Sequence, residues 1–484
     1  MKKTLIFCSA LLMLSGTSCV DSLKEYNVDP KSATLVPGST LISGAERSLV
    51  RLVTSTSVNN NPFRLYVQYW AETTYFDEDI YDIETRTINR NFWDQMYTGV
   101  LVNLKEATRL IDADVLLDAK VKANQKAAAE ILTVYTYATL VNTFGNVPYT
   151  EALDTSKPQP KYDDAATIYT DLFRRLDAAI AALDPSAQGL RDADLIYNGD
   201  VAKWIKFANS LKLRMAITIA DVDAARSKTL AEQTVGKTFT SNADNASVTF
   251  TGASPNTNPL YEQLVQSGRN DFVGAATFVN RLNTLNDPRI SYFFKFVGEG
   301  TSAPQPGVFK GGTTGVGNSY SINSAPGSAL EDPTLPGVLL SYSEVEFLLA
   351  EGKERGYAAI PGTAESHYNA AVTASILSFN GTAAEAAAYL AQPSVAYATA
   401  GATYKEKIGV QKWIALYDQP VEAWKEVRRL DSPRIIAPAG ALSVYPVRFP
   451  YPTTEKSLNK ANNSAAAGAI GGDDVGTKIF WDKF

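Results

Sequence analysis

One stretch constrains the fold of this chain more than any other, the segment GDVAKWIKFANSLKLRMAITIA at residues 199–220. Its apolar side chains recur at the three- and four-residue intervals of an α-helix, and Asp200 is placed to cap the first turn. The apolar positions cover two faces: Val201, Trp204, Ala208, Leu211 and Met215, and then Phe207, Leu213 and Ile217. Because a helix that is apolar on two sides must lie between neighbours, we predict a mostly α fold of stacked helix pairs.

Periodic segments of the same kind recur along the chain and support this prediction. No clean repeat of about 34 residues is present, so a tetratricopeptide-like core is inferred from helix pairing and not from consensus letters. Gly145 is placed to end one helix, and Ser343 and Glu346 have the spacing of a capping box at the start of another. The further predicted helices lie near residue 40 and at 89–111, 125–145, 162–185, 340–356, 365–379, 405–417 and 419–430.

Two long stretches lack helical periodicity, residues 73–93 and the Gly-, Ser-, Thr- and Pro-rich residues 298–337. Loops of such length inside a globular chain are commonly functional or disordered. Aromatic rings in loops are already partly exposed, and a ring can stack on the apolar face of a sugar. The loop aromatics are Tyr75, Phe76, Tyr81, Trp93, Phe309 and Tyr320. Four other tryptophans fall in predicted helices and are interpreted as core: Trp70, Trp204, Trp413 and Trp424. A short strand is expected at 246–250, and the chain after about residue 435 reads as irregular.

The first residues have the layout of an export signal. Lys2 and Lys3 precede an apolar run too short to span a bilayer, and the small residues SGTS lead to Cys19. We predict a lipoprotein signal peptide at 1–18, a lipidated tether at 19–38 and one domain at 39–484. After cleavage Cys19 is the sole cysteine, which excludes an internal disulfide and favours acylation of its sulfur. Ordinary secretion, with Cys19 as an incidental thiol, is the alternative.

Signatures of catalysis and of nucleic-acid binding are mostly missing from the sequence. The net charge of −6 argues against a nucleic-acid partner, and no glycine-rich phosphate-binding motif follows a strand. His367 is the one histidine and is interpreted as a surface or packing residue. The acidic segments at 77–82, 112–118 and 192–200 lack calcium-loop spacing. They are interpreted as solvated loops, so no cofactor is expected. A structural calcium ion is the alternative.

An ordered set of motifs resembles the SusD/RagB family of outer-membrane nutrient-binding lipoproteins, in its SusD-like branch. The match runs nearly end to end. It starts at Cys19 and comprises YNVDPKSAT, FGNVPYTEAL, YNGDVAKWIKFANSLKLRMA, NDPRISYFF, LLSYSEVEFLLAEGKERG, WIALYDQPVEAWKEVRRLDSPRI, FPYPTTEKSLN and the closing KIFWDKF. Most of these blocks describe helix packing and identify the scaffold more than the ligand.

The resemblance implies a core of four tetratricopeptide-like helix pairs with a loop-rich remainder that holds the ligand. It also implies a lipid-anchored protein on the outer membrane, facing the cell exterior, that lies over a SusC-like TonB-dependent transporter. Such proteins bind oligosaccharides, or in some members oligopeptides, and pass them to the transporter. They are not enzymes.

The position of the ligand site is implied by the same resemblance. Residues 73–93 match the variable edge near the ligand cradle of the family, and residues 298–337 fall where members also contribute to it. The family has no fixed ligand-binding residues, so site residues are assigned to this sequence by position only. The predicted ligand contacts are Tyr75, Phe76, Asp77, Tyr81, Phe272 and Tyr320. For each of them, packing within its own loop is the competing interpretation.

Three alternatives stay open on the sequence. An oligopeptide could replace the oligosaccharide, since polar loops rich in Asn and Asp bond backbone amides equally well. A surface glycoside hydrolase would need two carboxyl groups about 5–10 Å apart in an open cleft. A helical-repeat adaptor without a small ligand would present a flat or convex surface where an aromatic-lined concavity is expected.

Overall fold

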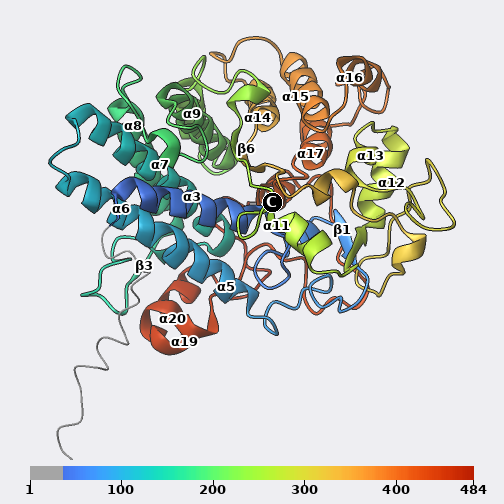
Figure 1. Ribbon diagram of the computed structural model, residues 1–484, viewed down its shortest axis with the longest axis horizontal. Coiled ribbons are helices and arrows are strands. Elements are labelled where there is room, and N and C mark those ends of the chain that lie inside the picture. Colours follow the sequence, from blue (N-terminus) through green and yellow to red (C-terminus); the bar gives the residue numbers. More distant parts are fainter. Residues whose placement is uncertain (1–35, 484) are drawn as a thin grey trace, which may run out of the picture. The chain divides into compact units, whose positions relative to one another are not determined.

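Helices form about half of the structure, and many of them pack in pairs (Figure 1). The computed structural model describes residues 36–483, and the chain from Gly38 onward packs as one unit. The predicted signal peptide, Cys19 and all but the end of the predicted tether lie outside the described residues. Four helix pairs are α3 (Gly38–Thr54) with α6 (Val102–Ala113), α7 (Ala119–Phe144) with α8 (Ala165–Ala182), α14 (Tyr342–Glu354) with α15 (Ala364–Ser378), and α17 (Tyr404–Ala415) with α18 (Pro420–Leu430).

Helix α9 (Val201–Thr218) is the segment that is apolar on two faces, and it packs against α7, α8, α14 and α10 (Ala224–Glu232). Burial on several sides is what its sequence pattern requires. The predicted mostly α fold is therefore confirmed, and the stacked pairs are consistent with a tetratricopeptide-like core. The predicted helix at 89–111 is also present: α5 (Ile88–Asp94) continues through a π-helical turn, Gln95–Leu101, into α6.

Local capping explains where the helices begin and end. The Asp200 carboxylate accepts the backbone N–H of Lys203 at 3.1 Å, as predicted, and Gly145 ends α7 with a φ of 83°. The predicted capping box at Ser343 and Glu346 is wrong by two residues. Ser341 caps α14, because its hydroxyl accepts from the N–H of Glu344, whereas the Ser343 hydroxyl donates to the carbonyl of Ala371 on α15.

The remaining helices are shorter and surround the pairs. Two of them correct the sequence analysis, which treated the chain after residue 435 as irregular: α19 (Thr453–Leu458) and α20 (Lys460–Ala469). Both contact β3 (Tyr162–Asp163) and lie on the opposite side of the molecule from β1 (Trp70–Glu72) in the view of Figure 1. The others are α4 (Phe63–Tyr66), α11 (Pro259–Tyr261), α12 (Ala276–Leu285), α13 (Ile290–Phe293) and α16 (Ala383–Leu390).

Strands occur as three short antiparallel pairs within the described residues. The predicted strand at 246–250 is present as β4 (Ala246–Val248), which pairs with β6 (Gly337–Leu340). The other pairs are β1 (Trp70–Glu72) with β5 (Phe272–Gly274) and β2 (Val147–Pro148) with β3 (Tyr162–Asp163). None is large enough to organise the fold by itself.

The core is apolar with a buried ionic network inside it. The four tryptophans interpreted as core, Trp70, Trp204, Trp413 and Trp424, are all at most 2% exposed. The predicted helix for Trp70 is wrong, because this residue begins strand β1. Between the helix pairs, Arg214 lies 2.6 Å from Glu344, and Arg429 lies 2.5 Å from Glu351. Because each of these buried charges has a close partner, the network fixes the helices relative to one another.

Candidate functional site

A small antiparallel ladder organises the surface that the sequence predicts as the ligand site. Strands β1 and β5 pair with Ala71 opposite Val273 and Glu72 opposite Phe272. Opposed side chains in such a ladder share a face. Ala71 and Val273 therefore form the outer face, on which the ring of Tyr320 packs, while Trp70 and Phe272 meet on the inner face with ring centroids 5.3 Å apart.

Residues 310–324, here called the strap, run alongside this ladder. The N–H of Gly312 donates to the carbonyl of Gly274 at 2.8 Å. The N–H of Gly274 donates to the carbonyl of Ser324, also at 2.8 Å. A Cβ atom at Gly312 would lie 2.5 Å from the side-chain oxygen of Asn318, so only glycine allows this close approach. The Asn318 amide in turn donates to the carbonyl of Glu72 at 2.8 Å. The strap is thus held to the ladder by main-chain bonds.

Residues 73–87, here called the edge loop, follow β1 directly. Three of its non-glycine residues have left-handed backbone angles, with φ of 57° at Tyr75, 71° at Tyr81 and 50° at Thr87. Such conformations are uncommon outside glycine and gather at binding sites, where surrounding contacts hold them. Here those contacts include the bond from the Thr73 N–H to the carbonyl of Asp271 at 2.9 Å. We call the exposed surface of the edge loop and the strap the edge face.

Three carboxyl groups are buried beneath the edge face: Glu72, Glu78 and Asp79, each at most 3% exposed. The Glu72 N–H donates to the Asp79 carboxylate at 3.0 Å, and the Asp79 N–H donates to the Glu72 carboxylate at 3.1 Å. Asp79 also accepts from the Gly315 N–H at 3.2 Å, which ties the strap to the edge loop. Arg86 is a close cation, at 2.6 Å from Glu78.

Burial of more carboxyl groups than cations raises their pKa values. The pKa of Glu72 rises to about 10 because of burial and the neighbouring charges of Asp79 and Glu78. The pKa of Asp79 rises to about 7, again chiefly through burial. Burial also raises the pKa of Glu78, although Arg86 opposes the shift. At neutral pH the cluster therefore carries protons, and it holds the edge loop as a hydrogen-bonded support.

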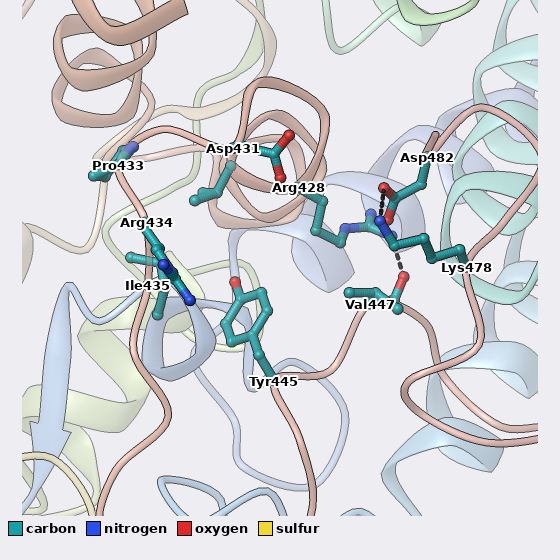
Figure 2. A pocket seen from close by; sticks show the side chains of 10 residues that line it. Arg428, Asp431, Pro433, Arg434, Ile435, Tyr445, Val447, Lys478 and Asp482 are labelled. Carbon is teal, nitrogen blue, oxygen red and sulfur yellow. Dashed lines mark hydrogen bonds and ion pairs between the residues drawn. The ribbon is translucent and has the colours of Figure 1, made fainter. Parts of the chain in front are cut away.

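Two further hollows have linings that include no residue of the edge loop or the strap. The first, about 410 Å³, is at the C-terminal end of α18 (Figure 2). Arg428 at its base is stacked 3.5 Å from the Trp424 ring and donates to the carbonyls of Val447 and Asn142. Burial lowers the pKa of Arg428 to about 10. Since this guanidinium is already bonded to main-chain carbonyls, its evident role is structural.

The second hollow, here called the helix hollow, has a volume of about 450 Å³. It is bounded by the residues around β4 and β6, by α15 and by the turn that precedes α18. Its lining mixes hydroxyl, amide and carboxyl groups with two aromatic rings, Tyr292 and Phe379, whose centroids are 5.1 Å apart. It shares no lining residue with the edge loop or the strap.

Residues 36–483 contain no group of three or more His, Cys, Asp or Glu side chains arranged to hold a metal ion. No helix in that part of the chain is long and apolar enough to cross a membrane. His367 bridges two elements: its ring nitrogens lie 2.6 Å from the Glu346 carboxylate and 2.8 Å from the carbonyl of Pro361. This is the packing role expected for it.

Comparison with known proteins places this fold in a family. A sequence profile named SusD-like and described as "Starch-binding associating with outer membrane" matches residues 30–452. The chain belongs to the SusD-like family. SusD-like proteins are binding proteins associated with the outer membrane. No curated protein sequence matches this chain.

Solved SusD-like structures superpose over almost the whole chain. A chitin-binding protein is 25% identical, with a TM-score of 0.80 over 92% of this chain and 100% of that one. A chitin-binding SusD homologue from Flavobacterium johnsoniae is 25% identical, with a TM-score of 0.77 over 91% and 98% of the two chains. A SusD homologue from Bacteroides uniformis is 25% identical, with a TM-score of 0.75 over 92% and 99%. These matches confirm the family and the fold predicted from the sequence.

Four of the six predicted ligand contacts lie on the edge face of this SusD-like protein. Tyr75 is the most open, with 67% of its surface exposed, and the Arg269 guanidinium is 6.0 Å from its ring centroid. Phe76 and Asp77 are half-buried, and Asp77 lies 3.6 Å from Arg86. Tyr320 is half-buried on the outer face of the ladder. Their contact with a ligand stays a prediction.

The other two predicted contacts are buried in the core. Phe272 is 3% exposed, because strand alternation places it on the inner face of the ladder, where it packs against Trp70. Tyr81 is 4% exposed, with edge-on contacts to the rings of Tyr66 and Tyr445. As placed, neither ring offers a free face to a ligand. The loop aromatic Trp93 is also buried, at 5%, within α5.

Sequence reasoning missed the polar partners of these rings. Arg269, beside the Tyr75 ring, comes from the residues before β5, and it also pairs with Asp271 at 2.7 Å. A signal was available for Arg269, since the polar segment GRND directly precedes the apolar FVGA of the strand. The carboxyl cluster had no such signal, because DEDIYD reads as a solvated loop and its burial depends on the strap.

Proposed function

We propose that this protein captures oligosaccharides on its edge face, without altering them, and passes them to a SusC-like TonB-dependent transporter. The observation that carries the proposal is the placement of the exposed Tyr75 ring, with Arg269 beside it, next to a ladder whose outer face is covered by Tyr320. Exposed rings supply stacking for sugar faces, and the neighbouring charged and amide groups supply hydrogen bonds for hydroxyl groups.

The support beneath these rings suits a binding site better than a hydrolytic one. A glycoside hydrolase needs a general acid and a second carboxylate that both reach the substrate. The carboxyl groups of Glu72, Glu78 and Asp79 are instead buried beneath the edge face. Those of Glu72 and Asp79 accept main-chain N–H groups, and that of Glu78 pairs with Arg86. Their geometry supports a rigid loop, which lowers the entropic cost of binding.

Chitin-derived oligosaccharides are the first ligands to test, because two SusD-like proteins of known structure with 25% identity are chitin-binding. The acetamide groups of such a ligand both donate and accept hydrogen bonds, which the Arg269 guanidinium beside Tyr75 and its partner Asp271 can complement. An oligopeptide carries the same amide chemistry and is the alternative cargo.

We further propose that Cys19 is acylated and anchors the protein on the exterior face of the outer membrane. One acyl chain gives only marginal membrane binding, so a stable anchor requires two or three chains on this residue. The proposal can be tested by mass spectrometry of protein from native membranes. An unmodified Cys19 in protein released to the medium would contradict it.

The cargo can be identified with purified residues 20–484 on a glycan array that includes chitin oligosaccharides, together with a mixed peptide pool. We expect retention of oligosaccharides by the native protein and loss of retention in the Tyr75→Ala/Tyr320→Ala double variant. Retention of peptides alone would replace the oligosaccharide with the alternative cargo. Retention of neither would contradict the proposed capture function.

A further inference from the structure

The acidic segment DADVLLD, which joins α6 to α7, presents apolar side chains to solvent. Val115 is 89% exposed and Leu116 is 92% exposed, the two highest values among the large apolar residues of the described chain. Scattered exposed apolar residues are normal on a protein surface, but here two of them are adjacent in one loop. We call residues 114–118 the tip loop.

The acids of the tip loop hold it in place. The Asp114 carboxylate accepts the N–H of Leu116 at 2.8 Å, and the Asp118 carboxylate accepts the N–H of Lys120 at 2.9 Å as the N-cap of α7. Leu117 is partly buried and packs against the core. The exposed pair is thus carried on an ordered loop, so a partner surface can cover it at a small further cost in entropy.

The tip loop lies at the end of the domain where the chain enters it. Helix α3 begins at Gly38, and a Cβ atom there would lie 2.6 Å from the carbonyl oxygen of Ala107 and 2.7 Å from Cγ1 of Ile111. Both contacts are in the last two turns of α6, and the tip loop follows α6 directly. Cys19 precedes Gly38 by only 19 residues, which can span at most about 65 Å.

This position indicates what covers the exposed pair, given the proposed acylation of Cys19. A bilayer that holds the lipid of Cys19 is confined to the neighbourhood of this end of the domain. Such a tether raises the effective concentration of the surface, so a contact that is weak by itself becomes populated. Two weak membrane signals on one protein also combine into a stable attachment. Two aliphatic side chains beside the tether can supply the second signal.

The charges around the tip loop favour contact with acyl chains over attraction to anionic headgroups. Lys120 lies 2.8 Å from Asp184, and Lys126 lies 2.7 Å from Asp112. Lys122 donates to the main-chain carbonyl of Asp112, and its charge is opposed by the two acids of the tip loop. Anionic lipids attract clusters of unmatched basic residues, which residues 109–126 do not present.

We propose that the tip loop inserts Val115 and Leu116 into the acyl-chain region of the bilayer that holds Cys19. The loop then forms a second contact of this protein with the membrane. Strand β1 leads into the edge loop, and α6 and β1 lie on opposite sides of the view in Figure 1. A membrane contact at the tip loop therefore leaves the edge face free for a ligand.

The test supplies the tether chemically. Cys19 is the sole cysteine of residues 19–484, so the purified chain can be coupled through this thiol to maleimide lipid in phosphatidylcholine vesicles. Leu116→Trp places a fluorescent indole in the tip loop. The six native tryptophans are at most 5% exposed, so a quencher in the bilayer acts on the added indole. The matched control is Ile436→Trp, because Ile436 is 74% exposed and its carbonyl accepts from Gln68, close to β1.

We expect brominated acyl chains to reduce the fluorescence added by Leu116→Trp by about twofold or more, because the indole lies at the acyl boundary. The reduction should be the same at low and high salt, and it should be smaller when Val115→Asp is also present. The fluorescence added by Ile436→Trp should not change. These substitutions are at exposed positions and should leave the fold intact.

Equal quenching of the two added indoles, or none at Leu116→Trp, would overturn the inference. Crosslinking of an unquenched tip loop to a protein in native membranes would assign the exposed pair to a protein partner instead. The proposed acylation is tested separately by mass spectrometry of the native protein, because the coupled vesicles supply the tether whether or not the cell modifies Cys19.

Discussion

Two regions of the molecule bury charged groups in opposite ways. Between the helix pairs, Arg429 contacts both Glu351 and Glu426, and Lys412 lies 2.7 Å from Glu426. Beneath the edge face lie three buried carboxyl groups, of which Glu78 pairs with Arg86 while Glu72 and Asp79 form no ion pair within the described residues. In the core, buried carboxylates are paired with buried cations, whereas the carboxyl groups beneath the edge face are neutralised by protons. The comparison indicates that the scaffold is stabilised by fixed ion pairs, and that the binding surface is supported by groups which respond to pH.

The pKa values express this difference. Burial alone would raise the pKa of Glu426, but Arg429, Lys412 and Lys425 hold it well below its usual range. Stability from Glu426 is therefore present above its unfolded pKa and is lost in acid. The raised pKa values of Asp79 and Glu72 have the opposite effect on stability. The folded protein favours their protonated forms, so their contribution to stability decreases as pH rises above the unfolded pKa values.

The largest expected effect is the loss of a charge from the core network. Arg429→Met leaves Glu351 and Glu426 buried without their shared partner, and removal of one member of a buried pair costs about 3–5 kcal/mol. Urea unfolding followed by circular dichroism measures the change in free energy of unfolding. Arg109→Met is the matched control, since Arg109 pairs with Glu106 on the surface and should leave stability unchanged. Equal stability of the two variants would contradict the contrast drawn here.

The second prediction concerns the edge loop and pH. As pH rises from about 4 through 7 and then 10, Asp79 and Glu72 lose the protons that the folded loop retains, so the loop should open more readily. Hydrogen exchange of residues 73–87, corrected for the intrinsic rate, should show weaker protection at pH 9 than at pH 6.

The control for this prediction is the Glu72→Gln/Asp79→Asn variant, in which neutral amides replace the protonated carboxyl groups. Its edge loop should keep the same protection at both pH values. Protection of α18 should not fall between pH 6 and pH 9 in either protein. A native edge loop whose protection is unaffected by alkaline pH would show that the carboxyl cluster is not a proton-dependent support.

The smallest expected effect is that of Tyr75→Ala. Tyr75 is 67% exposed, so its loss should leave the melting temperature unchanged. Loss of one stacking ring should weaken oligosaccharide binding by about 1 kcal/mol, or about fivefold. Isothermal titration with a chitin hexasaccharide measures this change. A drop in stability without a change in affinity would mean that Tyr75 only packs its own loop.

The sequence predicted the scaffold well because its pattern is local. The two apolar faces of residues 199–220 require neighbours, and Asp200 and Gly145 act as caps wherever the helices pack. The predicted capping box at Ser343 is wrong because α14 begins two residues earlier, with Ser341 as its N-cap. The helices α19 and α20 were not predicted, because TTEKSL is short and polar and KANNSAAAGA has little apolar periodicity.

The candidate site was only partly predictable because it is assembled from distant segments. The edge loop and strap were located from their lack of periodicity, and Tyr75 and Tyr320 do lie on that surface. The placement of Phe272 depends on the register of β5 against β1, which one sequence does not specify. The helix hollow combines residues from 196 to 419, and no local pattern joins them.

The central claim is that the edge face holds an oligosaccharide. Hydrogen exchange of the purified chain with and without a saturating chitin hexasaccharide tests it most directly. The account predicts added protection in residues 73–87 and 310–324, with none in α7 and α8. Saturating ligand that leaves both segments unchanged while protecting only the helix pairs would contradict the account.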